Sequence, residues 1–186
     1  MTAPLKYLEL IATQLASFPI DKLHESITVL QEAHLKEKNV FLIANGGSAG
    51  FLSHWEVDWI KGIFLATGKP LHAISIPNRV GLFSAASNDF GWSIAFQEIL
   101  RMQAKKDDVL VAVSSSGESQ NIVNATRFAV DNELKTISLS GFGDTSLSRI
   151  SEVSIALNSS DMQVVEDCHQ IFGHLVLKSF GGKCQD

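Results

Sequence analysis

The feature of this sequence that most restricts its fold is a series of five short apolar runs, separated by segments with helical periodicity. Most of these runs are continuously apolar rather than alternating, which is typical of strands buried on both faces of a parallel sheet. The five predicted strands are Asn39–Ala44, Leu71–Ile76, Asp108–Val113, Lys135–Ser140 and Val153–Leu157. Strands that alternate with helices predict an α/β fold, a three-layer sandwich with a five-stranded parallel sheet covered by helices on both faces.

Helices are predicted before the first strand and between the later ones. Two segments with apolar residues at helical spacing open the chain, the second with Asp21 as its N-cap. These opening helices, about residues 3–36, have more apolar positions than one sheet face needs, so we expect them to form an oligomerisation arm. The later helices are predicted from the turn after Ala44 to about Phe64, and over Gly91–Gln103, Gln120–Asn132 and Met162–Phe180. A length of 186 residues without a repeat or a long linker indicates one domain, residues 1–186.

Composition and charge argue against several classes of partner. The 45% of hydrophobic residues is enough for a sizeable core, and the net charge of −5 argues against nucleic acid, which needs a basic face. No apolar run has the length of a membrane span, and the N-terminus does not resemble a signal peptide. The two cysteines, Cys168 and Cys184, have no metal or redox spacing, and we expect Cys168 to be a packed thiol. These features favour a cytoplasmic protein with no nucleic-acid or membrane partner.

The most specific motif is Ser114–Ser119 (SSSGES), which joins a predicted buried strand to the start of a helix. Hydroxyl and free N–H groups converge at such a turn, where the helix dipole favours an anion. Gly117 would let the backbone approach a ligand closely. We therefore predict that phosphate is bound by Ser114, Ser115, Ser116 and Ser119. The pattern is not a P-loop, because the lysine is missing, and the alternative is a serine-rich turn with an ordinary N-cap.

A second polar turn, Asn45–Ser48 (NGGS), follows the first predicted strand. On its own this turn is as typical of simple turn chemistry as of a binding site. In parallel α/β folds, however, ligands bind beyond the carboxyl ends of the strands, and both polar turns lie at such ends. The candidate substrate-binding residues here are Asn45, Gly46, Gly47 and Ser48.

Ionisable residues follow this turn on the next predicted helix. His54 and Asp58 are four residues apart and therefore share one face of the helix. They could bind a metal ion or act as a base and its orienting partner, and the alternative is a solvent-facing or structural pair. Glu56 points elsewhere on the helix, and we expect it to be solvated.

Polar residues further along the chain are harder to interpret. The last predicted helix carries Glu166, His169 and His174, and the first and last of these are about 12 Å apart along its axis. From the spacing alone, an amphipathic helix with its polar residues towards water is favoured. The segment Asn88–Gly91 (NDFG) is interpreted as a turn that starts a helix, in which Asp89 either caps the helix or contacts a sugar.

These motifs, in this order, resemble the SIS sugar-isomerase family, and within it the phosphoheptose isomerases. The resemblance covers nearly the whole chain. It implies a flavodoxin-like SIS fold and a homotetramer with active sites at subunit interfaces. It also implies interconversion of sedoheptulose 7-phosphate and D-glycero-D-manno-heptose 7-phosphate, for heptose and lipopolysaccharide biosynthesis. The expected partner is therefore a small-molecule sugar phosphate.

The resemblance also implies roles for single residues. Ser48 and the four serines of the later loop match substrate-binding and phosphate-binding positions, and Asn45 and Asp89 match residues that line the sugar. Asn88, next to Asp89, is a further candidate substrate-binding residue. His174 matches a catalytic histidine. The family's zinc-ligand positions fall on His54, Asp58, Glu166 and His174, which implies one zinc ion per subunit, and Glu166 is also expected to contact substrate.

The chain departs from the family at several of these positions. Asp58 and Glu166 stand where the family usually has Glu and Gln. An arginine four residues after the first of these falls on Gly62, and an aspartate before the last helix falls on Gln163. Two carboxylates and two imidazoles still suit zinc, so these changes bear on the exact sugar rather than on the metal.

The implied mechanism moves a proton between adjacent carbons through an enediol, which needs a base and an acid. We expect Asp58 to be the base and His174 the acid, with zinc polarising the carbonyl. Residues that bind zinc cannot act as free acid–base groups without ligand exchange. Two other functions stay open. One is a non-catalytic tetrameric SIS scaffold of the replication-initiator-binding type, and the other is an isomerase or lyase for a different phosphosugar.

Overall fold

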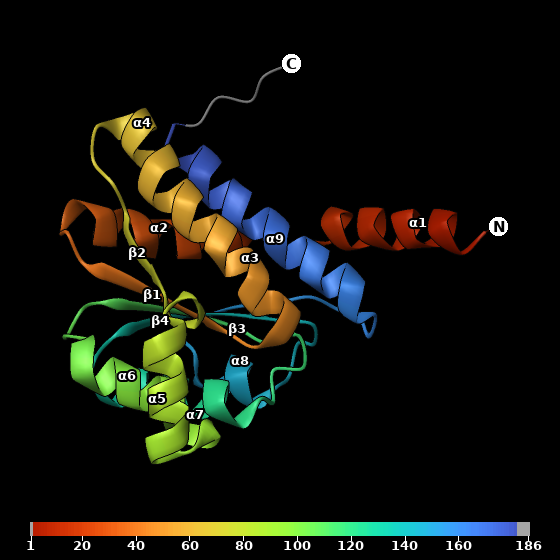
Figure 1. Cartoon of the computed structure of the whole chain (residues 1–186). Helices are drawn as coiled ribbons and strands as arrows, with labels where there is room; N and C mark the ends of the chain where they lie inside the picture. The colour runs from red at the N-terminus through yellow and green to blue at the C-terminus, as the bar shows by residue number, and fades with distance from the viewer. Residues whose placement is uncertain (1, 182–186) are drawn as a thin grey trace.

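The structure is a computed structural model that describes residues 2–181. Its centre is a parallel five-stranded sheet with the strand order β2–β1–β3–β4–β5 (Figure 1). The strands are β1 (Asn39–Ala44), β2 (His72–Ser75), β3 (Val109–Val113), β4 (Lys135–Ser140) and β5 (Val153–Ala156). All five predicted strands are confirmed, with ends shifted by at most one residue. This strand order is the flavodoxin-like order of doubly wound folds, so the predicted fold class is confirmed.

Helices cover both faces of the sheet and complete three layers (Figure 1). One face is covered by α2 (Ile20–Leu35), α3 (Gly46–Val57) and α9 (Met162–Ser179). The other is covered by α5 (Val80–Phe90), α6 (Ala95–Gln103), α7 (Gln120–Asp131) and the short α8 (Ser146–Ile150). Successive residues of β3 enter opposite apolar cores, Leu110 on one side and Val111 on the other. Burial on both faces explains why this strand is apolar throughout.

Helix α1 (Ala3–Ala16) lies apart from the sheet. It buries none of its residues, and Figure 1 shows it extending away from the body of the molecule. Leu5 and Leu8 are 54% and 61% exposed. The Tyr7 hydroxyl donates to Asp167 of α9 at 2.6 Å, and this carboxylate raises the pKa of Tyr7 to about 12. The two opening helices are confirmed, and their role as an oligomerisation arm stays a prediction.

Two helices were not expected from the sequence, and one turn was misplaced. Helices α5 and α8 were missed. The segment Asn88–Gly91 ends α5 instead of starting a helix, because Gly91 has a φ of +89° that stops the helix there. A 3-10 turn over Trp92–Ile94 then leads into α6. None of the helices within residues 2–181 combines the length and apolarity needed to cross a bilayer.

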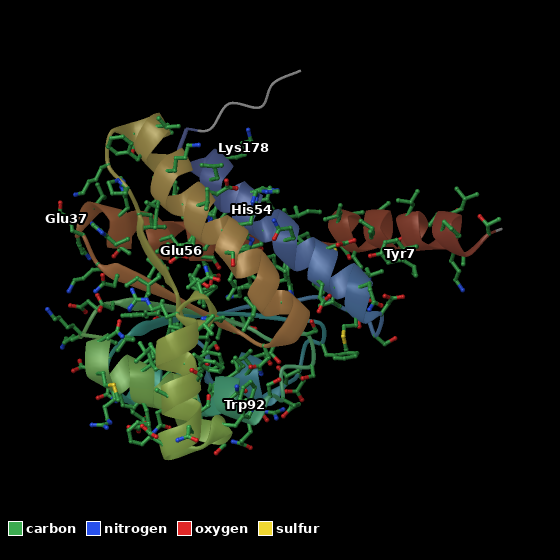
Figure 2. The ribbon with its side chains drawn as sticks, in the orientation of Figure 1. Tyr7, Glu37, His54, Glu56, Trp92 and Lys178 are labelled. Carbon is green, nitrogen blue, oxygen red and sulfur yellow. The ribbon has the colours of Figure 1, made fainter. Side chains whose placement is uncertain are left out.

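The interpretation of Glu56 as a solvated residue is also wrong. Its side chain is partly buried, and its two carboxylate oxygens accept the N–H of Ser75 at 3.0 Å and the Asn78 amide at 2.7 Å. Glu56 therefore connects α3 to the end of β2 (Figure 2). The partner residues lie 19 and 22 positions later in the sequence, so no local pattern could show this contact.

Candidate active site

A cavity of about 230 Å³ opens at the carboxyl ends of β1 and β3. These strands are neighbours, with Ala44 opposite Val113, so the turns that follow them meet. The cavity is lined by Asn45, Gly46, Gly47, Ser48, Val113, Ser114, Ser115, Ser116, Ser119, Met162 and Glu166. The structure therefore brings both predicted polar turns and one predicted residue of the last helix to a single cavity.

The Ser114–Ser119 loop is held in shape by its own hydroxyl groups. The Ser114 hydroxyl donates to Ser119 Oγ at 3.2 Å and accepts the N–H of Gly117 at 3.1 Å. Gly117 has a φ of +67°, and a Cβ at this position would collide with Thr145. Both facts require glycine here. Ser114 is buried while Ser116 is exposed, so the loop presents its later serines to the cavity.

Two helices begin at the cavity without a cap from the residue that precedes them. Asn45 precedes α3 and Ser119 precedes α7, and both residue types are favoured N-caps. Neither side chain accepts a hydrogen bond from the first turn of its helix. The N-terminal ends of two helix dipoles therefore face one cavity, whose lining within residues 2–181 contains no basic residue. Backbone N–H groups and dipoles, and not lysine or arginine, would attract an anion there.

A second group of ionisable side chains lies where α3 meets α9. His54 Nε2 is 3.0 Å from His174 Nε2, and Asp58 Oδ2 is 3.4 Å and 3.6 Å from these two nitrogens. Figure 2 shows His54 where α3 and α9 run side by side. Tetrahedral zinc with bonds of about 2.0–2.1 Å separates its ligand atoms by roughly 3.3 Å. The triangle therefore fits one ion with a fourth position left open, and His54, Asp58 and His174 form a possible metal site.

Close packing between α3 and α9 brings these side chains together. The indole rings of Trp55 and Trp59 stack with centroids 5.4 Å apart, and Phe172 of α9 contacts both rings. Gly173 allows the approach, because a Cβ there would overlap the Trp55 ring. The Trp59 indole also donates to the Gly173 carbonyl at 3.0 Å. Since Gly173 directly precedes His174, this packing determines where His174 meets α3.

Asp58 is the first residue of a π-helical segment, η1 (Asp58–Gly62), which continues into α4 (Ile63–Thr67). The Asp58 carbonyl accepts the N–H of the residue five positions later, and the Trp59 carbonyl accepts the N–H of Leu71 at 3.2 Å. Such segments are frequent at functional sites. A Cβ at Gly62, where the family resemblance expects arginine, would lie 2.8 Å from Leu177 of α9. Glycine in place of the expected arginine therefore allows α9 to pack closely against this segment.

Glu166 lies outside the cluster formed by His54, Asp58 and His174. Its carboxylate lies against Gly47 in the cavity, where an added Cβ would be 3.3 Å from Oε1. Two turns of α9 separate Glu166 from His174. The described part of one chain therefore places three of the four expected zinc ligands around one point, and the fourth at the neighbouring cavity.

The other candidate residues have different outcomes. Asn88 and Asp89 do not line the cavity; both are exposed, and the Asn88 amide donates to Asp89 at 3.0 Å. Their contact with sugar stays a prediction. His169 is fully buried, contrary to the expectation that it faces water, and burial lowers its pKa to about 4. Cys168 is a buried free thiol, as expected, and burial raises its pKa. Cys184 lies outside the described residues.

The sequence reasoning missed two polar residues that hold the serine loop in place. The Asn121 side chain exchanges two hydrogen bonds with Asn45, at 2.8 and 2.9 Å. The Glu118 carboxylate accepts the N–H of Ser146, the first residue of α8, at 2.8 Å, and this contact lowers its pKa. These partners lie 76 and 28 positions away, so the only signal in the sequence was proximity to the serine motif.

The strand order and the cavity at the carboxyl edge place the chain among the doubly wound α/β proteins. Residues 6–141 match the family described as the SIS domain, and the chain belongs to this family. The phosphoheptose isomerase of Helicobacter pylori (strain ATCC 700392 / 26695) is 28% identical over 156 residues, which covers 84% of this chain and 81% of that protein. The phosphoheptose isomerase of a Nitratiruptor species is 30% identical over 145 residues, covering 78% and 77%.

Two solved structures share the fold. A phosphoheptose isomerase from Francisella tularensis superimposes with a TM-score of 0.87 at 21% identity, covering 98% of this chain and all of that one. The phosphoheptose isomerase from Neisseria gonorrhoeae gives 0.80 at 17% identity, covering 94% and 93%. At these identities the structural likeness establishes the architecture only.

Proposed function

We propose that this chain is a phosphoheptose isomerase that interconverts sedoheptulose 7-phosphate and D-glycero-D-manno-heptose 7-phosphate through an enediol. The observation that carries the proposal is the single cavity lined by both polar turns, with the His54–Asp58–His174 cluster further along the two helices that border it. Relatives named phosphoheptose isomerase that match over most of both chains support it.

The phosphate group would bind between the serine loop and the start of α3. Ser116 and Ser119 offer hydroxyl groups at the cavity, with Ser48 on its other side. Hydrogen bonds from hydroxyl and N–H groups to a charged phosphate contribute about 1.5–3 kcal/mol each. Glu166 lines the same cavity, and a carboxylate beside a bound phosphate would accept hydrogen bonds from sugar hydroxyls rather than contact the anion.

The length of a heptose phosphate suits the separation between the cavity and the cluster. His54 lies six residues after Ser48 on α3, roughly 9 Å along the helix axis. The seven-carbon chain has six C–C bonds of about 1.5 Å each. With the 7-phosphate at the serine loop, the first two carbons would therefore reach the cluster. A seven-carbon substrate is therefore compatible with this separation.

Asp58 and His174 would carry the proton transfers at these carbons. The partly buried Asp58 carboxylate would take the proton from carbon, and His174 would give a proton to the neighbouring oxygen. Zinc held by His54, Asp58 and His174 would polarise the carbonyl and stabilise the enediolate. The same carboxylate and imidazole atoms would either bind zinc or exchange protons with the sugar. Comparing turnover with and without metal therefore separates the acid–base role of these residues from their role as zinc ligands.

Turnover tests the proposal directly. Protein purified without a metal-affinity tag should convert sedoheptulose 7-phosphate to an aldose phosphate, with the zinc content measured in the same preparation. A panel of six- and five-carbon ketose phosphates serves as the control for chain length. Equal turnover of all sugars would contradict the length argument. No turnover of any of them, with zinc added, would favour a non-catalytic SIS scaffold.

We further propose a cytoplasmic homotetramer in which α1 packs between subunits. Support comes from the exposed apolar side chains of α1, where the described part of the chain leaves Leu5 and Leu8 uncovered. A second exposed apolar group, Val57, Ile60 and Phe64, lies on the α3–η1–α4 helix. Light scattering at micromolar concentration should give four times the chain mass, and a monomer would contradict this assembly.

A further inference from the structure

The side chains of Asn45 and Asn121 form a reciprocal amide pair between the two turns that line the cavity. Asn45 follows β1, and Asn121 is the second residue of α7. Each amide N–H donates to the oxygen of the other, at 2.8 and 2.9 Å. Asn121 is only 1% exposed, and its oxygen also accepts the N–H of Ile122 at 3.0 Å. Two antiparallel hydrogen bonds fix both the distance and the orientation of the two residues.

Because of this pair, the Asn45 side chain does not cap the start of α3. Asn45 has the extended backbone of an N-cap, with φ −108° and ψ 160°, yet its amide is engaged with Asn121 and not with the first turn. Asn121 does not line the cavity. Its contact with Asn45 is therefore a link between the glycine turn and the serine loop.

We propose that Asn121 is a positioning residue that acts through Asn45 to hold the glycine turn and the serine loop at the separation where both contact one phosphate group. This inference rests on the proposed phosphate site. Without the pair, the two turns would lose the direct side-chain link between them at this edge. Anion binding would then have to offset the entropy of ordering the two turns.

The other end of the same two strands supplies a matched control. At the amino end of β1, the Asn39 N–H donates to Asp108 Oδ1 at 3.0 Å and the Asn39 amide donates to Oδ2 at 3.3 Å. Asp108 is 2% exposed, so this is also a buried polar contact between the two segments. It lies at the opposite edge of the sheet from the cavity. Replacing Asn39 by alanine removes the side-chain bond and keeps the backbone one, which should weaken the fold without moving the two turns.

The test compares N121A, N45A, the double variant N45A/N121A and the control N39A. Calorimetry measures the affinity of each full-length protein for inorganic phosphate, and thermal unfolding measures stability. N121A and N45A should each weaken phosphate binding about ten-fold. The double variant should bind phosphate no more weakly than the single variant with the lower affinity, because both single substitutions and the double substitution break the same pair. N39A should lower the unfolding temperature and keep the phosphate affinity within about two-fold of wild type.

A kinetic readout separates positioning from general stability. In N121A the KM for sedoheptulose 7-phosphate should rise about ten-fold with kcat changed far less, because the His54 cluster is not touched. If N121A does not fold, N121L fills the volume of the buried amide and replaces it in every comparison.

Three results would overturn the inference while leaving the phosphate site intact. These are unchanged affinity in N121A, a double variant with multiplied losses of about a hundred-fold, and an equal loss of affinity in N39A. Wild-type protein that does not bind phosphate would instead overturn the proposed site itself, and the inference with it.

Discussion

At the amino edge of the sheet the charged residues of the cavity pair with one another as ions, whereas at the carboxyl edge two helices begin without a side-chain cap. A cavity of about 150 Å³ at the amino edge is lined by three lysines and three acidic residues. These form three ion pairs, Lys36–Glu32, Lys38–Asp107 and Lys135–Glu152. At the carboxyl edge, Asn45 and Ser119 leave their helices uncapped, and no basic residue of the described chain lines the cavity.

Both edges have a cavity, so a cavity alone does not identify a binding site. What differs is whether the polar groups around the cavity are already bonded to other groups of the protein. Asp108, at the amino edge, accepts the N–H groups of Asn39 and Lys105, so its carboxylate is used by the fold. At the carboxyl edge neither Asn45 nor Ser119 caps the helix that follows it, so N–H groups at these two helix starts can serve a ligand. Substitutions at the two edges should therefore separate function from stability.

The largest effect is expected for Asp58, in the cluster with His54 and His174. D58N removes the charge that serves either as base or as metal ligand, so kcat should fall on the order of 10³-fold while substrate binding changes little. Steady-state kinetics and calorimetry with sedoheptulose 7-phosphate measure the two quantities. D131N, at an exposed aspartate that ends α7, is the matched control. A D58N protein with wild-type kcat would remove Asp58 from the mechanism.

The second effect concerns the serine loop. The double variant S116A/S119A removes two hydroxyl groups from the cavity, and binding of the sugar phosphate should weaken by roughly 1.5–3 kcal/mol for each. The fold should survive, because Ser116 is exposed and Ser119 is partly exposed on a loop. Calorimetry measures the affinity, with S84A on the surface of α5 as control. Unchanged affinity in the double variant would place the anion elsewhere.

The third prediction tests the packing that brings the cluster together. In G173A the new Cβ overlaps Trp55, so α3 and α9 must separate and stability should fall by about 1–3 kcal/mol. Zinc affinity should fall with it, because His54 and His174 move apart. G50A on the same helix as His54 meets no atom within 4 Å and should be neutral or slightly stabilising. Urea unfolding and zinc titration of both variants measure the difference.

The smallest effect on function is expected at the amino edge. The two carboxylate oxygens of Asp108 accept the backbone N–H groups of Asn39 and Lys105. In D108N an NH₂ group replaces one of these oxygens and cannot accept, which should lower the free energy of unfolding by about 1–3 kcal/mol. Neither kcat nor phosphate affinity should change. Urea unfolding combined with the isomerase assay checks both statements. A loss of turnover larger than the loss of folded protein would show that the two edges are coupled, contrary to the comparison above.

The strands and their order of appearance could be predicted from the sequence, because burial on both faces of a parallel sheet produces apolar runs with a clear pattern. The polar turns after β1 and β3 were predictable for the same reason, since parallel strands place their carboxyl ends at one edge. The pairing of His54 with Asp58 also follows from local spacing on one helix. All these features depend on residues that are near one another in the chain.

What only the tertiary structure decided depends on contacts between distant segments. The approach of His174 to His54 requires the packing of Trp55 against Gly173, and the position of Glu166 at the cavity follows from the packing of α9 beside Gly47. The use of Glu56 in a loop contact and the burial of His169 have the same origin. So does the Asn45–Asn121 pair, whose members are 76 positions apart. Local periodicity identifies which face of an element is buried, but the partner on that face is determined only when the layers pack.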